Sequence, residues 1–133
     1  MEIVLSNIAT LSVTINCSYN TAFTYLSAPM NQKEWAIHFF QDIEEIDGEI
    51  IATLPFGKLP MKIKSDHATG ILDIYLGDGK PTRTRLINIQ DNLNMYNFTL
   101  TQPKGMPDEV WKNKALPDMQ HELNTLKSIL ENK

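Results

Sequence analysis

His67 and Asp73 are the first side chains in the sequence whose types and spacing point to possible chemistry. They lie six residues apart in the segment SDHATGILDIYLGDG, and a histidine held beside a carboxylate can act as a general acid or base. The same segment also has the features of a β-hairpin, because Gly70 stands between two runs of alternating apolar residues. The pair is catalytic only if the fold brings both side chains to the same place.

The length of the loop between these two runs decides which way the side chains point. The strands bury their aliphatic faces together only if the loop has an even number of residues, because a shift of one residue exchanges the two faces of a strand. A four-residue loop sets Lys64 opposite Asp73, whereas a two-residue loop sets Asp66 against Asp73, where like charges repel. Neither loop makes His67 face Asp73, so we interpret the segment as a structural hairpin.

Arg85 and Tyr96 are the two polar residues that we consider as candidates for catalysis. Tyr96 alternates with polar residues and is predicted to face inward, where its hydroxyl needs a partner. The turn at 91–92 decides the position of Arg85. With two residues in the turn, Arg85 enters the interior and can hold a carboxylate or enolate; with three, Thr84 and Leu86 take the interior positions and Arg85 points to solvent. Because a buried unpaired arginine is costly, the solvent position is favoured.

The sequence offers little for a metal, a cofactor or a nucleophile. The three histidines, His38, His67 and His121, are far apart and share no ligand spacing such as H-x-x-x-H. Cys17 is the single cysteine, which excludes an intrachain disulfide and a multi-cysteine metal site. The sequence contains no glycine-rich phosphate loop and no G-x-S-x-G motif. We therefore expect no metal and no cofactor.

The composition is that of an ordinary soluble protein. The 133 residues are 42% hydrophobic and 21% charged, with a formal net charge of −4. We expect a single domain spanning residues 1–133, and the acidic balance gives no reason to expect nucleic acid as a partner. No window approaches about eighteen consecutive apolar residues, and the opening MEIVLSNIATLSV lacks the features of a signal peptide. With the single cysteine, this predicts a cytoplasmic protein without a membrane span.

One strand and two short helices are expected in the first part of the chain. Residues 8–16 alternate with the period of a strand, and residues 18–29 place apolar side chains on one face of a short helix. Asn31 and Glu34 have the spacing of a capping box, which predicts a second short helix that presents Trp35.

Six further strands and a long helix complete the chain. Turn residues recur about every ten residues, which is typical of an antiparallel meander. The expected strands cover residues 38–46, 49–54, 58–66, 71–77, 82–90 and 94–102. From 108 to 132, apolar residues recur at steps of three and four, which predicts a helix that is broken or restarted at Pro117. The predicted fold class is α+β, with the C-terminal helix across the concave face of a bent seven-stranded antiparallel sheet.

Three segments resemble the START-like, or SRPBCC, superfamily. They are SYNTAFTYLSAPMNQKEW after the first strand, HATGILDIYLGDG followed by TRTRLIN, and MYNFTLTQPKGMPDEVW running into HELNTLKSILE. The resemblance covers nearly the whole chain and is strongest to small bacterial polyketide cyclase/dehydrase-like proteins. It implies a helix-grip fold with an apolar cavity for a lipid-like or polycyclic ligand.

The inward faces of the strands and the stripe of the helix supply candidate ligand-binding residues. These are Trp35, Met61, Ile63, Leu72, Ile74, Tyr96, Phe98, Met119 and Leu123. Trp35 either lines the cavity or closes the core. We predict that the chain binds a small hydrophobic or amphipathic ligand, as a monomer or a homodimer. Two alternatives stay open: an enzyme of polyketide cyclase, aromatase or dehydratase type, and an interaction module with a solid core that works through its surface.

Overall fold

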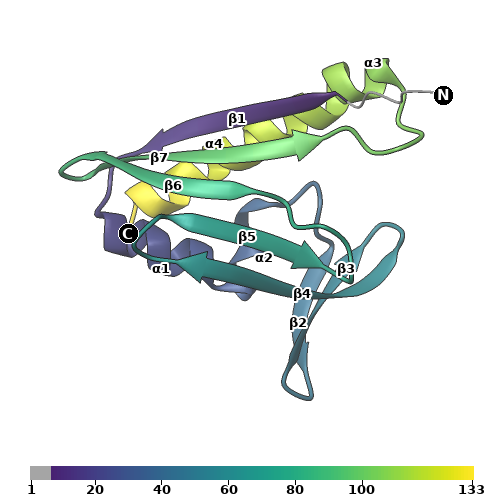
Figure 1. Cartoon of the computed structure of the whole chain (residues 1–133), viewed down its shortest axis with the longest axis horizontal. Helices are drawn as coiled ribbons and strands as arrows, with labels where there is room; N and C mark the ends of the chain where they lie inside the picture. The colour runs from purple at the N-terminus through teal and green to yellow at the C-terminus, as the bar shows by residue number, and fades with distance from the viewer. Residues whose placement is uncertain (1–6) are drawn as a thin grey trace.

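The computed structural model describes residues 7–133, which form a seven-stranded antiparallel sheet in the order β1-β7-β6-β5-β4-β3-β2 (Figure 1). The strands are β1 (Ile8–Ile15), β2 (Asp42–Ile46), β3 (Glu49–Leu54), β4 (Gly57–Asp66), β5 (Ile71–Leu76), β6 (Thr84–Gln90) and β7 (Leu93–Thr101). In Figure 1 the strands β2 and β3 turn away from the direction of β1 and β7, and the helix α4 lies along β1 and β7. The helix-grip α+β fold predicted from the sequence is confirmed.

The single domain predicted over residues 1–133 includes residues 1–6, which lie outside the described residues. That prediction, and the one concerning a signal peptide at the start of the chain, stay predictions. Among the described residues, no helix has both the length and the apolar character needed to cross a membrane.

The helices are α1 (Tyr19–Ser27), η1 (Pro29–Asn31), α2 (Gln32–Trp35), α3 (Asp108–Val110), the π-helical turn η2 (Trp111–Ala115) and α4 (Leu116–Glu131). The two short helices after β1 are therefore confirmed, but the predicted capping box is wrong. The Asn31 amide donates to the carbonyl of Tyr25, and the Glu34 carboxylate accepts from the Tyr25 hydroxyl at 2.6 Å. Both side chains hold α2 against α1 instead of capping α2.

A wide helical turn lies where the sequence predicted an interruption at Pro117. Pro117 occupies the first turn of α4, where its missing N–H leaves no hydrogen bond unmade. Just before it, the N–H of Leu116 donates to the carbonyl of Trp111, which is the spacing of a π-helix. The helical run therefore continues through Pro117, and the side chain of Trp111 stays buried.

The β4–β5 hairpin has the predicted four-residue loop. Lys64 is paired with Asp73 in the register of the two strands. His67 approaches Asn20, with 2.7 Å between His67 Nε2 and Asn20 Oδ1, while Asp73 forms an ion pair with Arg83. His67 and Asp73 are therefore not a dyad, and the interpretation of this segment as a structural hairpin is confirmed.

A β-bulge in the β6–β7 hairpin turns Arg85 outward. The turn at 91–92 has two residues, but the register shifts at 88–90, and one extra residue exchanges the two faces of a strand. Thr84 and Leu86 are consequently buried, and Arg85 is exposed. The solvent position favoured for Arg85 is confirmed, although it results from a bulge and not from a three-residue turn.

The strand predicted at 38–46 is too long at its start, since β2 begins at Asp42. The N–H groups of Phe39 and Phe40 donate to the carbonyl of Ala36 at 3.2 and 3.0 Å, and these local hydrogen bonds close a turn. A backbone that makes turn hydrogen bonds cannot use the same N–H groups in a sheet ladder. This turn connects α2 to β2 and contacts α4, since the N–H groups of His38 and Phe39 donate to Glu122.

The two halves of α4 have different surroundings. Leu123, Leu126 and Leu130 are at most 1% exposed and belong to the same buried cluster as Ile15 of β1. The space between helix and sheet is filled there. At the N-terminal half of α4, around Met119, the helix borders a cavity instead.

Candidate functional site

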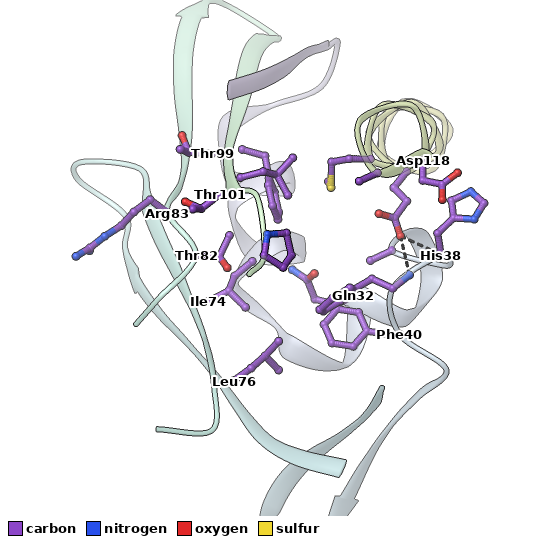
Figure 2. Close-up of a pocket in the computed structure, with 18 of the residues that line it drawn as sticks. Gln32, His38, Phe40, Ile74, Leu76, Thr82, Arg83, Thr99, Thr101 and Asp118 are labelled. Atoms are coloured by element: carbon purple, nitrogen blue, oxygen red, sulfur yellow. Dashed lines mark hydrogen bonds between the residues drawn. The ribbon is translucent and has the colours of Figure 1, made fainter. Parts of the chain in front are cut away.

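A cavity of about 680 Å³ lies between the N-terminal half of α4 and the sheet (Figure 2). Strands β5 and β7 form one wall, α2 and the turn after it form a second, and the helical run 110–122 forms a third. The loop between β5 and β6 borders the rim. Pockets of this volume hold small organic ligands in many proteins. The predicted space between sheet and helix is therefore present, but only at one end of the helix.

Aromatic and aliphatic side chains make up most of the cavity wall. Trp35 and Phe40 come from the α2 region, Ile74 and Phe98 from the sheet, and Met119 from α4. The Trp35 ring packs edge-on against Phe98, with 6.5 Å between ring centroids. A ligand in this cavity would therefore make chiefly apolar contacts.

The structure brings four of the predicted ligand-binding residues to the cavity. These are Trp35, Ile74, Phe98 and Met119. Met61, Leu72, Tyr96 and Leu123 are buried in the core away from the cavity wall, and Ile63 is half-buried beside that core. The alternation of the strands gave the correct face for these residues, whereas their distance along the sheet from the hollow end of the molecule was not encoded in that pattern.

Neither catalytic candidate reaches the cavity. The Arg85 guanidinium is on the outer face of the sheet, where its Nε donates to the carbonyl of Thr69 at 2.9 Å. Tyr96 is 1% exposed; burial raises the pKa of its hydroxyl, and a hydrogen bond with Thr84 acts in the opposite direction. The Arg83 side chain also points away from the cavity in Figure 2. Its guanidinium forms an ion pair with Asp73.

Glu122 is the polar residue of the cavity that sequence reasoning missed. Its side chain comes from α4, is 3% exposed as a residue, and forms part of the cavity wall. The carboxylate oxygen Oε2 accepts hydrogen bonds from the N–H groups of His38 at 2.9 Å and Phe39 at 3.3 Å (Figure 2). The turn that shortened the predicted strand at 38–46 supplies both donors.

The environment of Glu122 favours its neutral form. Burial raises the pKa of the Glu122 carboxyl to about 7, the hydrogen bonds from His38 and Phe39 act in the opposite direction, and the nearby Asp118 carboxylate adds to the rise. Near neutral pH such a carboxyl group exchanges its proton readily, so it can donate a proton, accept one or pair with a cation.

The signal for Glu122 was its position within the apolar stripe of the helix. It lies three residues after Met119 and four before Leu126, which is the spacing of residues on one helix face. Charged residues are almost never fully buried without a partner, so a glutamate on such a stripe is exceptional. The charged residue at an apolar position of this helix face was therefore the sequence signal for Glu122.

Gln32 adds a second polar group to the wall. The residue is 3% exposed, and Figure 2 shows its amide directed into the cavity. The buried indole N–H of Trp35, in the same wall, has no hydrogen-bond partner among the described residues. His38 and His121 lie at the outside of the same wall, with 2.8 Å between His38 Nε2 and His121 Nδ1. Residues 7–133 contain no group of three or more side chains suited to hold a metal ion.

Comparison with known proteins shows which solved structures have a similar fold. No family model matches the chain, and no curated protein matches it. An aromatase/cyclase from a Streptomyces species is similar to it with a TM-score of 0.72 and 10% identity, over 96% of this chain and 95% of that one. A START superfamily protein from Mycobacterium smegmatis has a TM-score of 0.68 and 11% identity over 94% and 97% of the two chains.

Norcoclaurine synthase from Thalictrum flavum is a third similar structure, with a TM-score of 0.64 and 10% identity over 99% of this chain and 98% of that one. At these identities the similarity concerns the fold. The chain has the START-like helix-grip fold, as the sequence resemblance implied.

Proposed function

We propose that the chain binds a small hydrophobic or amphipathic molecule, lipid-like or aromatic, in the cavity between α4 and the sheet. The supporting observation is the volume of about 680 Å³ bordered by Trp35, Phe98 and Met119 beside an otherwise filled core. When an apolar ligand binds, the apolar side chains that border this space exchange contact with water for dispersion contacts with the ligand, and the ligand itself leaves water. The open cavity also counts against the interaction module, which required a solid core.

A second candidate function is catalysis of the cyclase or dehydratase type, and Glu122 favours it. A carboxyl group with a pKa of about 7 at the wall of an apolar cavity is suited to general acid–base chemistry. Two of the similar structures are named as an aromatase/cyclase and a synthase. Binding without catalysis predicts that an added ligand is recovered unchanged, whereas catalysis predicts a product that disappears in Glu122→Gln.

Filling the cavity is expected to weaken the binding of an apolar probe strongly. Ile74 on the sheet and Met119 on α4 both line the cavity, so the double variant Ile74→Trp/Met119→Trp places two indoles in the space that a ligand needs. We expect the affinity for Nile red, a neutral environment-sensitive dye, to fall at least tenfold in a fluorescence titration. Ile46→Trp, at a 43% exposed position of β2, is the control and should bind like the wild type. Equal saturable binding by all three proteins would contradict the proposal.

We further propose that the chain is a cytoplasmic, single-domain protein that functions without nucleic acid. A single cysteine, Cys17, supports a reducing compartment such as the cytoplasm, and the net charge of −4 supports a function without nucleic acid. A cavity whose walls come from α2, the sheet and α4 supports the packing of these elements into a single domain, which we propose for 1–133. Native mass spectrometry of the freshly purified protein would give both the oligomeric state and the mass of any retained ligand.

A further inference from the structure

We propose that the cavity selects a ligand that carries a protonated amine on an apolar body, and that the amine pairs with Glu122. The inference rests on the proposed binding function and names the chemical class of the ligand. The supporting observation is that the Glu122 carboxylate is buried in a mostly apolar wall and has no cationic partner among the described residues.

The two oxygens of the Glu122 carboxylate have different surroundings. Oε2 accepts both backbone hydrogen bonds, from His38 and Phe39. Oε1 accepts none from the described residues, yet it is not among the side-chain atoms that are sealed off without a partner, so it is open to the cavity. The fixed oxygen orients the carboxylate, and the open oxygen is available to a donor on the ligand.

The charged groups around Glu122 leave its charge unmatched. On α4 itself, Asp118 pairs with Lys114 of η2 at 3.0 Å, and Glu122 forms no ion pair with any described residue. The imidazole rings of His38 and His121 lie on the outer side of the wall, with 2.8 Å between His38 Nε2 and His121 Nδ1. Asp118 adds negative potential beside Glu122, which further favours a cation.

Two basic residues border the cavity from the sheet side, and neither offsets Glu122. Arg83 forms an ion pair with Asp73 and points away from the cavity (Figure 2). Lys80, in the loop between β5 and β6, is exposed at the rim, where water solvates its ammonium group. A buried charge discriminates between ligands far more strongly than a solvated one, because water screens the latter. The buried carboxylate should therefore determine the selectivity.

A ligand ammonium group would supply both the positive charge and the hydrogen-bond donor that the Glu122 carboxylate lacks. It offers three donors, one of which can bind Oε1 of Glu122, while the Gln32 amide is a further polar group that faces the cavity. A charge-assisted hydrogen bond in an apolar surrounding is stronger than one between neutral groups. An alcohol makes the weaker bond, and a carboxylate is repelled.

The test compares three ligands that share one ring system. We would titrate the protein with 1-naphthylmethylamine, 1-naphthylmethanol and the carboxylate 1-naphthaleneacetate by isothermal titration calorimetry at pH 7.5. The amine is expected to bind at least tenfold more tightly than the alcohol, and the acetate most weakly. Glu122→Gln should weaken amine binding at least tenfold and alter alcohol binding less than threefold. Glu131→Gln, at the other end of α4, should keep the amine preference.

Each other outcome has a defined meaning. Equal binding of amine and alcohol by the wild type overturns the inference and leaves the proposed binding function standing. Absence of binding for all three ligands overturns both. If a folded Glu122→Gln protein loses amine binding and alcohol binding equally, Glu122 only supports the shape of the cavity. If Asp118→Asn loses the preference for the amine, that preference depends on the Asp118 carboxylate. Either result overturns the inference.

The pH dependence of amine binding supplies a second readout. Between pH 6 and pH 8 the amine stays protonated while Glu122 ionises, since its pKa is about 7. Amine affinity should rise several-fold across this range in the wild type and stay flat in Glu122→Gln. His38, His121, Asp118, Lys114 and Lys80 are present in both proteins, so the difference between the two profiles isolates Glu122. A wild-type profile identical to that of Glu122→Gln would contradict the inference.

Discussion

Gly70→Ala is expected to destabilise the protein by about 3 kcal/mol or more, which is a large part of the total stability of a typical domain. Gly70 ends the β4–β5 loop with φ +77°, and a Cβ atom built on it would lie 1.9 Å from the carbonyl oxygen of Leu86. The N–H of Leu86 donates to the carbonyl of Gly70 at 2.9 Å, so the clash falls on a backbone contact that joins the loop to β6. No side chain can rotate to relieve it.

The position of Gly70 in the sheet increases this effect. The regular ladder between β5 and β6 consists of the pair Ile71 and Arg85, with one isolated bridge between Ile74 and Thr82. The contact of Gly70 with Leu86 extends this short ladder by one step. Displacing β6 would therefore weaken the short β5–β6 pairing that joins strands β1, β7 and β6 to strands β5, β4, β3 and β2.

Gly48→Ala is the matched control for this prediction. Gly48, in the turn between β2 and β3, also has a positive φ of +83°, but a Cβ atom there would meet nothing within 4 Å. Its cost should be that of backbone strain alone, about 1 kcal/mol. Urea denaturation of both variants checks the difference. If Gly70→Ala loses no more stability than Gly48→Ala, the close approach of β6 to the loop is wrong.

The elements of this fold were predictable wherever local pattern and tertiary packing agree. The even loop rule placed Lys64 opposite Asp73 because both flanking strands bury one aliphatic face, and register is strongly specified in such strands. The stripe of α4 was equally clear, since Leu123, Leu126 and Leu130 all face the sheet and are almost completely buried. In both cases one periodic property of the sequence determines the result.

The features that the sequence did not reveal depend on single residues that break a pattern. The bulge at 88–90 inserts one residue into β6, and no composition rule marks it among the polar residues at that end of the strand. The turn at Phe39 and Phe40 uses apolar residues that read equally well as part of a strand. Both features determine where candidate residues lie, because the first turns Arg85 outward and the second supplies the donors that hold Glu122.

The position of the cavity along α4 was also not encoded in periodicity. Met119 and Leu123 occupy the same stripe, yet Met119 lines the cavity and Leu123 packs into the filled core. The difference comes from what lies opposite each residue, which depends on how the sheet curves and on the entry of the turn after α2. Alternation predicts which face a residue takes, and only the assembled fold shows whether that face packs against other side chains or borders a cavity.

Glu122→Gln is expected to make the protein more stable at pH 8 and to leave its stability at pH 5 nearly unchanged. The folded-state pKa of Glu122, about 7, lies above the ordinary value of 4.5, so the folded protein holds a proton there that the unfolded chain releases. Wild-type stability therefore falls as pH rises from about 4.5 to 7 and stays low above that, by up to about 3 kcal/mol. Glutamine keeps an oxygen for the N–H groups of His38 and Phe39 and has no charge to bury.

Denaturant unfolding at pH 5, 6, 7 and 8 measures this slope, and Glu131→Gln is the control. The Glu131 carboxylate accepts hydrogen bonds from Lys127 and from the backbone N–H and side-chain amide of Asn16, which lower its pKa to about 2. Its contribution is present above about pH 4.5 and is lost as pH falls toward 2, so Glu131→Gln should lower stability evenly from pH 5 to 8. A Glu122→Gln protein that is less stable than the wild type at pH 8 would contradict the prediction.

A stabilising Glu122→Gln variant would also bear on why a carboxylate occupies this wall. A carboxylate that destabilises the folded protein near neutral pH does not serve stability, and such local conflicts are expected at functional sites. We propose that it serves binding, because a ligand ammonium group beside the open oxygen of Glu122 would pair with the unmatched charge. The same substitution should therefore act in opposite directions on two measurements, raising the free energy of unfolding at pH 8 and weakening amine binding.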